Sequence, residues 1–391
     1  MKHKQKVPCS DFRSAMNNLN LPSAKVLVAM SGGVDSSVAA LLLKKQGYEV
    51  IGAFMVNWSD TKNKLTGECA WREEKKIAMK IAAKLGIKFI TLNFEKEYKK
   101  DVVDVMFKDY QKGITPNPDI DCNNKIKFPL LIKEAKKLKC DFIATGHYAR
   151  INPKGITFGV KTKDKYELFR AKDELKDQSY FLYRIKQNEL KNILFPIGEH
   201  TKKEVREIAK KNKFSNYDKK GTTGICFIGK INLKEFLQKR IKPKKGIILD
   251  PDGNKIGEHD GIYYYTIGQR IGSRFGIEVL KSEKMQKKWY VAKKDVKKNI
   301  IIAAPEGHKL NFRKEIYIKN SHWINEKPKN NLKVLSRIRQ VGELLPSKLE
   351  YKNGKLKVIL NKAITGVSQG QAIVLYRGEE CLGGGVISFD Y

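Results

Sequence analysis

Residues 25–43 read Lys25-Val-Leu-Val-Ala-Met-Ser-Gly-Gly-Val-Asp-Ser-Ser-Val-Ala-Ala-Leu-Leu-Leu43, and they predict a buried strand that runs through a glycine turn into a helix. The apolar run 26–30 has the length of an interior strand, and Gly47 supplies a stop for the helix. Two glycines at such a turn let the backbone approach a ligand and direct successive N–H groups at it. The helix dipole also favours an anion there. We therefore predict a phosphate-binding site at residues 31–36.

This loop differs from the two best-known glycine motifs. A Walker A loop ends in Gly-Lys-Ser/Thr, and the dinucleotide fingerprint carries a third glycine; the sequence here has neither. Ser31-Gly-Gly-Val-Asp-Ser36 instead resembles the pyrophosphate loop of ATP pyrophosphatases, which cleave ATP between the α and β phosphates. The resemblance implies adenylation of a substrate oxygen and release of pyrophosphate, with Asp35 placed to hold a magnesium ion. The alternative is an ordinary tight turn in an α/β protein.

The composition favours a polyanionic partner. The 391 residues suit two or three domains. Lys and Arg number 78 against 42 Asp and Glu, which gives a net charge of +36 and makes nucleic acid the leading candidate for a partner larger than ATP. Compositional drift that leaves only solvated lysine faces is the alternative.

Other features of the composition concern location and metals. No apolar run reaches the roughly 18 residues that a membrane helix needs, so we expect a soluble protein. The basic residues 1–24 lack the apolar segment of a signal peptide and predict a disordered tail. The cysteines are scattered without any Cys-x-x-Cys, which favours a reducing cytoplasm and argues against zinc, an iron–sulfur cluster or a disulfide framework. They are Cys9, Cys69, Cys122, Cys140, Cys226 and Cys381.

Strand and helix patterns alternate after the glycine loop. Strands are expected at 48–56, 88–94 and 141–145, and helices at 77–85, 102–110 and 126–138. The alternation predicts an α/β fold with a doubly wound, mostly parallel sheet, whose ligand lies beyond the carboxyl ends of the strands. Ser31, Met55 and the Gly146-His147 turn would emerge there. Residues 115–128 are expected to form a functional loop, because two prolines stiffen it and a thiol follows.

The alternation stops near residue 218, so residues 25–218 are expected to form the catalytic domain. Strand-like runs punctuated by glycine at 246–257 and 263–270 predict a small central domain at 219–305. Short strands follow to the C-terminus, including a hairpin signal at 349–360 with an Asn-Gly turn. We therefore predict a C-terminal β-barrel at 306–391.

Seven short motifs, in one order along the chain, resemble those of the tRNA-specific 2-thiouridylases. The resemblance spans all but the residues before Lys25. It implies ATP-dependent replacement of the C2 oxygen of the wobble uridine of tRNA by sulfur, the reaction of a tRNA-uridine 2-sulfurtransferase. The motifs are Ser31-Gly-Gly-Val-Asp-Ser36, Asn117-Pro-Asp-Ile-Asp-Cys-Asn123, Ala144-Thr-Gly-His-Tyr148, Lys176-Asp-Gln-Ser-Tyr180, Gly224-Ile-Cys-Phe-Ile-Gly229, Tyr265-Thr-Ile-Gly-Gln-Arg270 and Cys381-Leu-Gly-Gly-Gly385.

The resemblance also implies which residues meet the two substrates. The expected ATP-binding residues are Ala29, Met30, Ser31, Gly32, Gly33, Val34, Asp35, Ser36, Met55 and Gly146. Asn117, Pro118 and Asp119 are expected to meet the target base, and the further expected tRNA contacts are His147, Lys176, Asp177, Gln178, Arg337, Ile338 and Gln371. The expected partners are ATP, Mg²⁺, the anticodon arm of tRNA, and a persulfide donor or relay protein.

Cys122 and Cys226 match the two catalytic cysteines of the family. A persulfide on Cys226 would deliver sulfur, and the Cys122 thiolate would break the remaining S–S bond and leave a Cys122–Cys226 disulfide. Asp119 would accept a proton. Asp121, beside Cys122, is a departure from the family pattern that should disfavour the thiolate.

Two other functions remain open from the residues alone. One is another adenylating enzyme with the same loop, such as a synthetase or an amidating enzyme. The other is a basic RNA-binding protein without catalysis. The large excess of basic residues and the β-rich C-terminal third argue against another adenylating enzyme. The intact residues of the glycine loop argue against a protein without catalysis.

Overall fold

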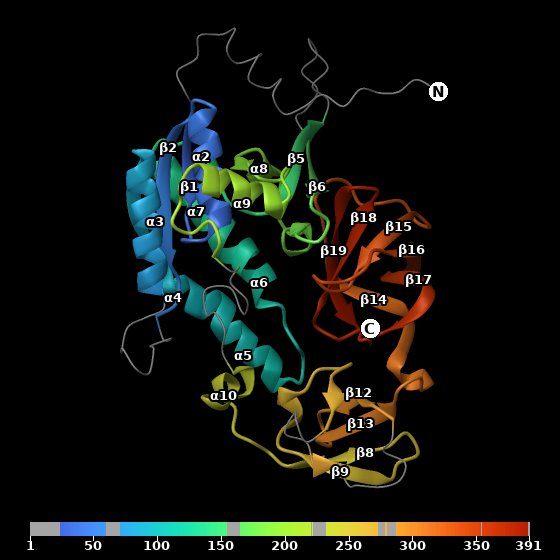
Figure 1. Ribbon diagram of the computed structural model, residues 1–391. Helices are drawn as coiled ribbons and strands as arrows, with labels where there is room; N and C mark the ends of the chain where they lie inside the picture. Colours follow the sequence, from blue (N-terminus) through green and yellow to red (C-terminus); the bar gives the residue numbers. More distant parts are fainter. Residues whose placement is uncertain are drawn as a thin grey trace.

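The structure, a computed structural model, describes residues 24–59, 71–154, 165–219, 221, 232–272, 278–279, 287–352 and 354–389. Its N-terminal part is built on a five-stranded sheet in which every neighbouring pair is parallel (Figure 1). Each strand predicted for this sheet is present, and one short strand of the sheet, Ile193–Leu194, was not predicted. In sheet order the strands are β3 (Lys88–Asn93), β2 (Glu49–Val56), β1 (Lys25–Ala29), β4 (Phe142–Ala144) and β7 (Ile193–Leu194).

Helices cover both faces of this sheet. Val26 and Val28 of β1 pack into one hydrophobic cluster, which includes residues of α2, α3 and α9, whereas Leu27 packs into a second cluster with residues of α5 and α7. Successive residues of a strand point to opposite faces, so burial of all three requires cover on both sides. This confirms the doubly wound fold. The longer helices are α2 (Val34–Lys45), α3 (Trp71–Leu85), α5 (Asp104–Gln111), α7 (Phe128–Lys137) and α9 (Lys202–Lys211), and the shorter ones are α4 (Glu95–Tyr98) and α8 (Gln187–Leu190).

The predicted loop at 115–128 is wrong from Pro118 onward. Pro118 opens α6 (Pro118–Asp121), which continues through a π-helical turn (Cys122–Lys127) into α7. The Asn117 side chain caps α6 by accepting a hydrogen bond from the Ile120 N–H at 3.4 Å. A proline at the first helical position costs nothing there, because that N–H has no partner within the helix. Pro118 therefore starts a helix instead of maintaining a loop.

The central part is a six-stranded sheet preceded by α10 (Leu233–Gln238). The strand-like run at 263–270 was wrongly predicted: Ile262–Tyr264 forms a 3₁₀ turn, and pairing begins only at Arg270. In sheet order the strands are β10 (Arg270–Ile271), β12 (Trp289–Asp295), β13 (Ile300–Pro305), β8 (Gly246–Leu249), β9 (Lys255–His259) and β11 (Glu278–Val279).

The C-terminal part is the predicted β-barrel. Six antiparallel strands follow one another, and β14 pairs with both β17 and β19, which closes the ring. The predicted hairpin is β16–β17, and Gly354 adopts the positive φ of 71° that its turn needs. The strands are β14 (Phe312–Trp323), β15 (Lys333–Arg337), β16 (Leu345–Lys352), β17 (Lys355–Thr365), β18 (Ala372–Arg377) and β19 (Glu380–Ser388).

A hairpin from the N-terminal part extends this barrel sheet. β5 (Ala149–Lys154) pairs with β6 (Lys165–Arg170), and β6 pairs with β19 through Phe169–Glu380 and Leu168–Cys381. The N-terminal part and the barrel therefore share one hydrogen-bonded sheet. Figure 1 shows this hairpin between the two parts. No helix within the described ranges is both long and apolar enough to cross a bilayer.

Candidate active site

The glycine loop, residues 31–36, lies where β1 ends and α2 begins. Gly32 has a φ of 78°, a conformation that favours glycine. The Ser36 hydroxyl accepts a hydrogen bond from the Ser31 N–H and donates one to the Gly33 carbonyl, both at 3.1 Å. Gly33 is the N-cap residue of α2, and no side chain accepts a capping hydrogen bond from the helix there. The first N–H groups of α2 lack partners within the helix, an arrangement by which many proteins bind anions. Binding of a phosphate here stays a prediction.

The turn after β4 packs directly on this loop. A Cβ atom added at Gly146 would lie 2.6 Å from the Ser36 nitrogen and 2.7 Å from the Asp35 carbonyl carbon. Met55 is buried next to the end of the neighbouring strand β2. The carboxyl ends of β1 and β4 thus meet, as the order of strands predicts. Contact of these residues with ATP stays a prediction.

Lys202, which the sequence did not single out, forms an ion pair with Asp35. Its Nζ atom lies 2.6 and 2.7 Å from the two carboxylate oxygens of Asp35. The Tyr148 hydroxyl donates a further hydrogen bond to Asp35 Oδ1 at 2.8 Å. Burial and the adjacent carboxylate both raise the pKa of Tyr148, so the hydroxyl keeps its proton. The sequence Thr201-Lys-Lys-Glu204 marks the start of a helix, but nothing in it indicates that Lys202 contacts Asp35.

This arrangement does not fit a magnesium ion held by Asp35 alone. Both carboxylate oxygens already accept hydrogen bonds from Lys202. Over the described ranges, no three His, Cys, Asp or Glu residues lie close enough together to hold a metal. Mg²⁺ bound through one carboxylate normally takes further ligands from phosphates and water.

The expected base-binding segment leads directly to Cys122. Cys122 is fully buried at the start of the π-helical turn, and Asp119 is half-buried in α6. Asp121 forms ion pairs with Lys125 at 3.2 Å and with Arg184 at 3.7 Å. These two cations offset the charge that was expected to oppose a Cys122 thiolate. Cys226, the predicted Cys122–Cys226 disulfide, Cys69 and the N-terminal tail (residues 1–23) lie outside the described residues.

His147 joins this segment to the glycine loop from inside the protein. Its ring lies 2.8 Å from the Thr145 hydroxyl and 3.4 Å from Lys127 Nζ, and it packs on Phe128. Burial, with the Lys127 charge, lowers the pKa of His147 well below its usual value, so the ring is neutral. The turn after Gly146 is thereby fastened to the helix that carries Cys122. The predicted tRNA contact of His147 stays a prediction.

Asp177 and Arg337, both expected to contact tRNA, form a buried ion pair between the N-terminal part and the barrel. Arg337 donates to Asp177 Oδ2 at 2.7 Å, and their side chains are 5% and 0% exposed. The Ser179 hydroxyl and backbone N–H also donate to this carboxylate. Removing one partner of such a pair leaves an uncompensated buried charge. The pair therefore fixes the orientation of the two parts.

Gln371 provides a second link, close to Asn117. Its Nε2 donates to the carbonyl oxygens of Thr115 at 2.8 Å and Pro116 at 2.9 Å. The Tyr180 hydroxyl donates to the Ala372 carbonyl at 3.1 Å. The barrel thus holds the residues that lead into the expected base-binding segment.

The other expected tRNA contacts differ in exposure. Lys176 is exposed and Ile338 is buried. Gln178 pairs with the backbone of Tyr148: it accepts the Tyr148 N–H at 2.9 Å and donates its own N–H to the Tyr148 carbonyl at 2.8 Å. The motif around Lys176–Gln178 is thereby tied to the residue that contacts Asp35.

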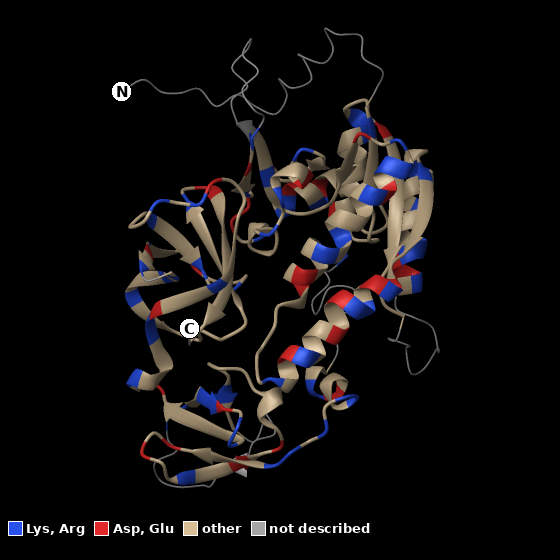
Figure 2. Cartoon of the chain, turned by 180° about the vertical axis from the view of Figure 1, so that it is seen from behind, with Lys and Arg blue, Asp and Glu red and all other residues tan. Residues whose placement is uncertain are grey.

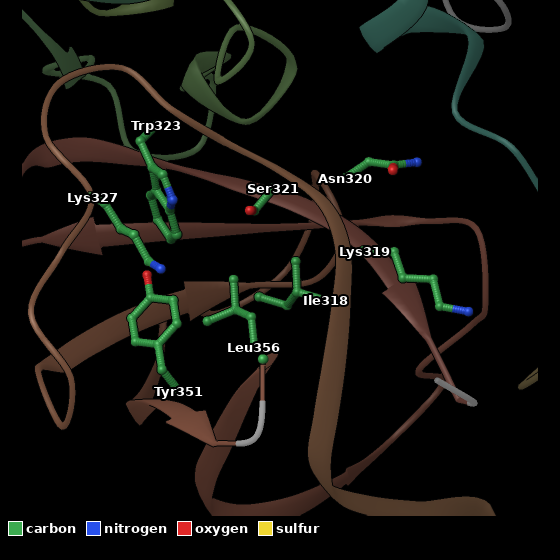
Figure 3. A pocket seen from close by; sticks show the side chains of 9 residues that line it. Ile318, Lys319, Asn320, Ser321, Trp323, Lys327, Tyr351 and Leu356 are labelled. Atoms are coloured by element: carbon green, nitrogen blue, oxygen red, sulfur yellow. The ribbon is translucent and has the colours of Figure 1, made fainter.

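A pocket of about 610 Å³ opens in the barrel, not at the glycine loop (Figure 3). Trp323 and Tyr351 line it, and Lys327 Nζ lies 4.1 Å from the centre of the Tyr351 ring. Aromatic rings beside lysines are the combination by which proteins stack bases and contact phosphates of single-stranded nucleic acid. The lining is Ile318, Lys319, Asn320, Ser321, Trp323, Lys327, Tyr351, Gly354 and Leu356.

Comparison with known families divides the chain into three matched ranges. Residues 24–230 match the model described as tRNA methyl transferase HUP domain, residues 234–305 the tRNA methyl transferase PRC-barrel domain, and residues 313–387 the aminomethyltransferase beta-barrel domain.

Several curated proteins are similar to this chain over nearly its whole length. The tRNA-specific 2-thiouridylase MnmA of Lactobacillus helveticus is 41% identical over 373 residues, which cover 94% of this chain and 96% of the relative. The tRNA-specific 2-thiouridylase MnmA 2 of Aliarcobacter butzleri is 43% identical, over 93% of this chain and 98% of its own length. The Bacillus subtilis protein named tRNA-specific 2-thiouridylase MnmA is 40% identical, over 94% and 95%.

Proposed function

The chain belongs to the tRNA-specific 2-thiouridylase family, and on this premise we propose that it replaces the C2 oxygen of the wobble uridine of tRNA with sulfur at the expense of ATP. The observation that carries the proposal is the glycine loop, which offers uncapped N–H groups to a phosphate and has no Walker lysine. Such a loop suits cleavage between the α and β phosphates of ATP.

Adenylation solves the chemical difficulty of this exchange. The uridine O2 is a poor leaving group, so sulfur cannot displace it directly. In the proposed first step O2 attacks the α phosphorus, the O2–P bond forms, and the bond to the bridging oxygen breaks with its electron pair on pyrophosphate. The N–H groups of the loop stabilise the charge on that leaving group. The base must first leave its stack, at a cost of about a few kcal/mol, and Asn117 and Asp119 suit a pocket that compensates for it.

The sulfur step uses the two cysteines. The terminal sulfur of a Cys226 persulfide attacks C2 and AMP leaves. The Cys122 thiolate then attacks Cys226 Sγ, which breaks the S–S bond, leaves the sulfur on the base and forms a Cys122–Cys226 disulfide. A thiol reductant must reopen this disulfide, and Asp119 serves as the proton acceptor at the base. The ion pairs of Asp121 support this assignment, because they keep its charge from opposing the thiolate.

ATP is the cosubstrate, and Mg²⁺ is proposed to enter with its phosphates. The Asp35 carboxylate is occupied by Lys202, so a metal brought by ATP agrees better with the geometry than one fixed beforehand.

The proposed partners are tRNA, through its anticodon arm, and a persulfide donor or relay protein. Figure 2 shows Lys and Arg along all three parts of the chain, in agreement with the net charge of +36. The aromatic and basic pocket of the barrel supports an RNA-binding role for that part. The tRNA substrate and the need for reduced cysteines both favour the cytoplasm.

Mass analysis of nucleosides tests this proposal. Unmodified tRNA incubated with the protein, ATP and a persulfide donor is expected to yield 2-thiouridine at the first anticodon position. The same mixture without ATP should yield none, because O2 is then never activated. Unchanged tRNA in the complete mixture, with an amide formed from an added carboxylate and amine instead, would favour the amidating alternative.

A further inference from the structure

The start of α9 is fixed beside the glycine loop. Thr201 and Glu204 form a reciprocal capping box: the Glu204 N–H donates to the Thr201 hydroxyl at 3.2 Å, and the Thr201 N–H donates to the Glu204 carboxylate at 2.6 Å. The Lys202 N–H donates to Asp173 at 2.8 Å. The first residue of the helix therefore has a defined position, and its side chain reaches Asp35.

The Lys202 ammonium is held there by two groups. Besides the Asp35 carboxylate, the Tyr148 ring lies below it, with the ring centre 5.9 Å from Nζ. The Lys202 side chain is 17% exposed and that of Asp35 is 29% exposed, so the pair is sheltered but open to a ligand. A charge in such a place interacts more strongly with a phosphate than one in bulk water.

Two further polar side chains from the same part of the chain lie near this site: the charge of Arg206 acts on Tyr148, and Asn216 contacts the glycine loop. Arg206 lies one turn after Lys202, on the same face of α9. Its Nε atom is buried without a hydrogen-bond partner within the described residues, while its Nη2 donates to the Lys219 carbonyl. Asn216 donates to the Gly32 carbonyl and to the Ser37 hydroxyl, both at 3.0 Å. Residues 202–219 therefore brace the loop and bring positive charge to it.

We propose that the Lys202 ammonium, assisted by Arg206, binds the β and γ phosphates of ATP and stabilises the leaving pyrophosphate. The inference rests on the proposed function and names the cation that the loop itself lacks. On binding, Nζ exchanges contact with one Asp35 oxygen for a phosphate oxygen, and Asp35 keeps the Tyr148 hydrogen bond. Lys202 transfers no proton in this step: the electron pair of the broken bond goes to pyrophosphate, and the ammonium offsets that charge.

Calorimetric titration with ATP, pyrophosphate and AMP tests this role. In Lys202→Ala, affinity for ATP and for pyrophosphate should fall about 10- to 100-fold, the range expected for a lost hydrogen bond between charged groups. Affinity for AMP should not change, because AMP lacks both phosphates. Lys203→Ala is the matched control, since Lys203 is the exposed neighbour on the same helix, and it should bind all three as the unaltered protein does.

Two further variants distinguish direct binding of phosphate by the positive charge from a purely structural role of the side chain. Lys202→Arg should retain part of the pyrophosphate affinity, and Arg206→Gln should lose affinity in the same direction as Lys202→Ala. Unchanged ATP and pyrophosphate affinity in Lys202→Ala would overturn the inference, as would an equal loss of AMP affinity, which marks a supporting role only. Failure of the unaltered protein to bind ATP and pyrophosphate would overturn the proposed function together with the inference.

Discussion

Replacing Cys122 with serine is expected to abolish formation of 2-thiouridine while adenylation and loading of Cys226 with sulfur continue. Serine cannot attack the S–S bond as a thiolate does, so the reaction stops after sulfur has bonded to the base. Cys122 lies at the start of a helical turn immediately after the segment that is expected to bind the base. Transfer of radioactive sulfur from a persulfide donor, followed on the protein and on tRNA, measures both stages.

The matched change at the other cysteine should give a different outcome. Cys226→Ser should adenylate tRNA yet accept no labelled sulfur, because an alcohol cannot form a persulfide. Cys140→Ser serves as the control: Cys140 is half-buried after α7, outside the proposed site, and its variant should thiolate normally. Wild-type rates in both Cys122→Ser and Cys226→Ser, or sulfur label on Cys122 instead of Cys226, would refute this division of roles.

Gly146→Ala is expected to impair ATP binding and adenylation by about a hundredfold, the cost typical of a displacement near 1 Å at a reacting site. The added methyl group would meet the loop backbone at 2.6–2.7 Å, and backbone cannot rotate away as a side chain can. Calorimetric titration with ATP measures the effect.

Gly221→Ala is the control for this change, because a Cβ atom at Gly221 meets nothing within 4 Å among the residues that the structure describes. It should bind ATP normally. Normal ATP binding by Gly146→Ala would mean that the turn after β4 does not shape the nucleotide site.

The parallel sheet was predictable because its strands are apolar on both faces. Val26, Leu27 and Val28 are all buried, and such runs stand out in a sequence. The β5–β6 hairpin was not predictable, since its place depends on a pairing between Leu168 and Cys381, far apart in the chain. No local pattern marks such a partner.

The parts of the candidate site that depend on backbone motifs were predictable from the sequence. The side-chain contacts that depend on tertiary packing were not. The glycine loop and Gly146 meet because of strand order. Lys202 was missed because one lysine among many carries no sign of its partner. Asp177 and Arg337 were expected only to contact tRNA, whereas the structure buries them as an ion pair between two parts of the chain. The residue type alone does not reveal whether a charged side chain is buried. A charge with an ionic partner can be buried, whereas a charge without one normally stays exposed to solvent.

The most direct test of the glycine loop as an adenylating site is to separate the products of ATP labelled on its α or γ phosphate. The reaction is run with and without tRNA that carries an unmodified wobble uridine. Labelled AMP and labelled pyrophosphate, formed only when the tRNA is present, are the predicted result. ADP and inorganic phosphate as the main products, with or without tRNA, would contradict it.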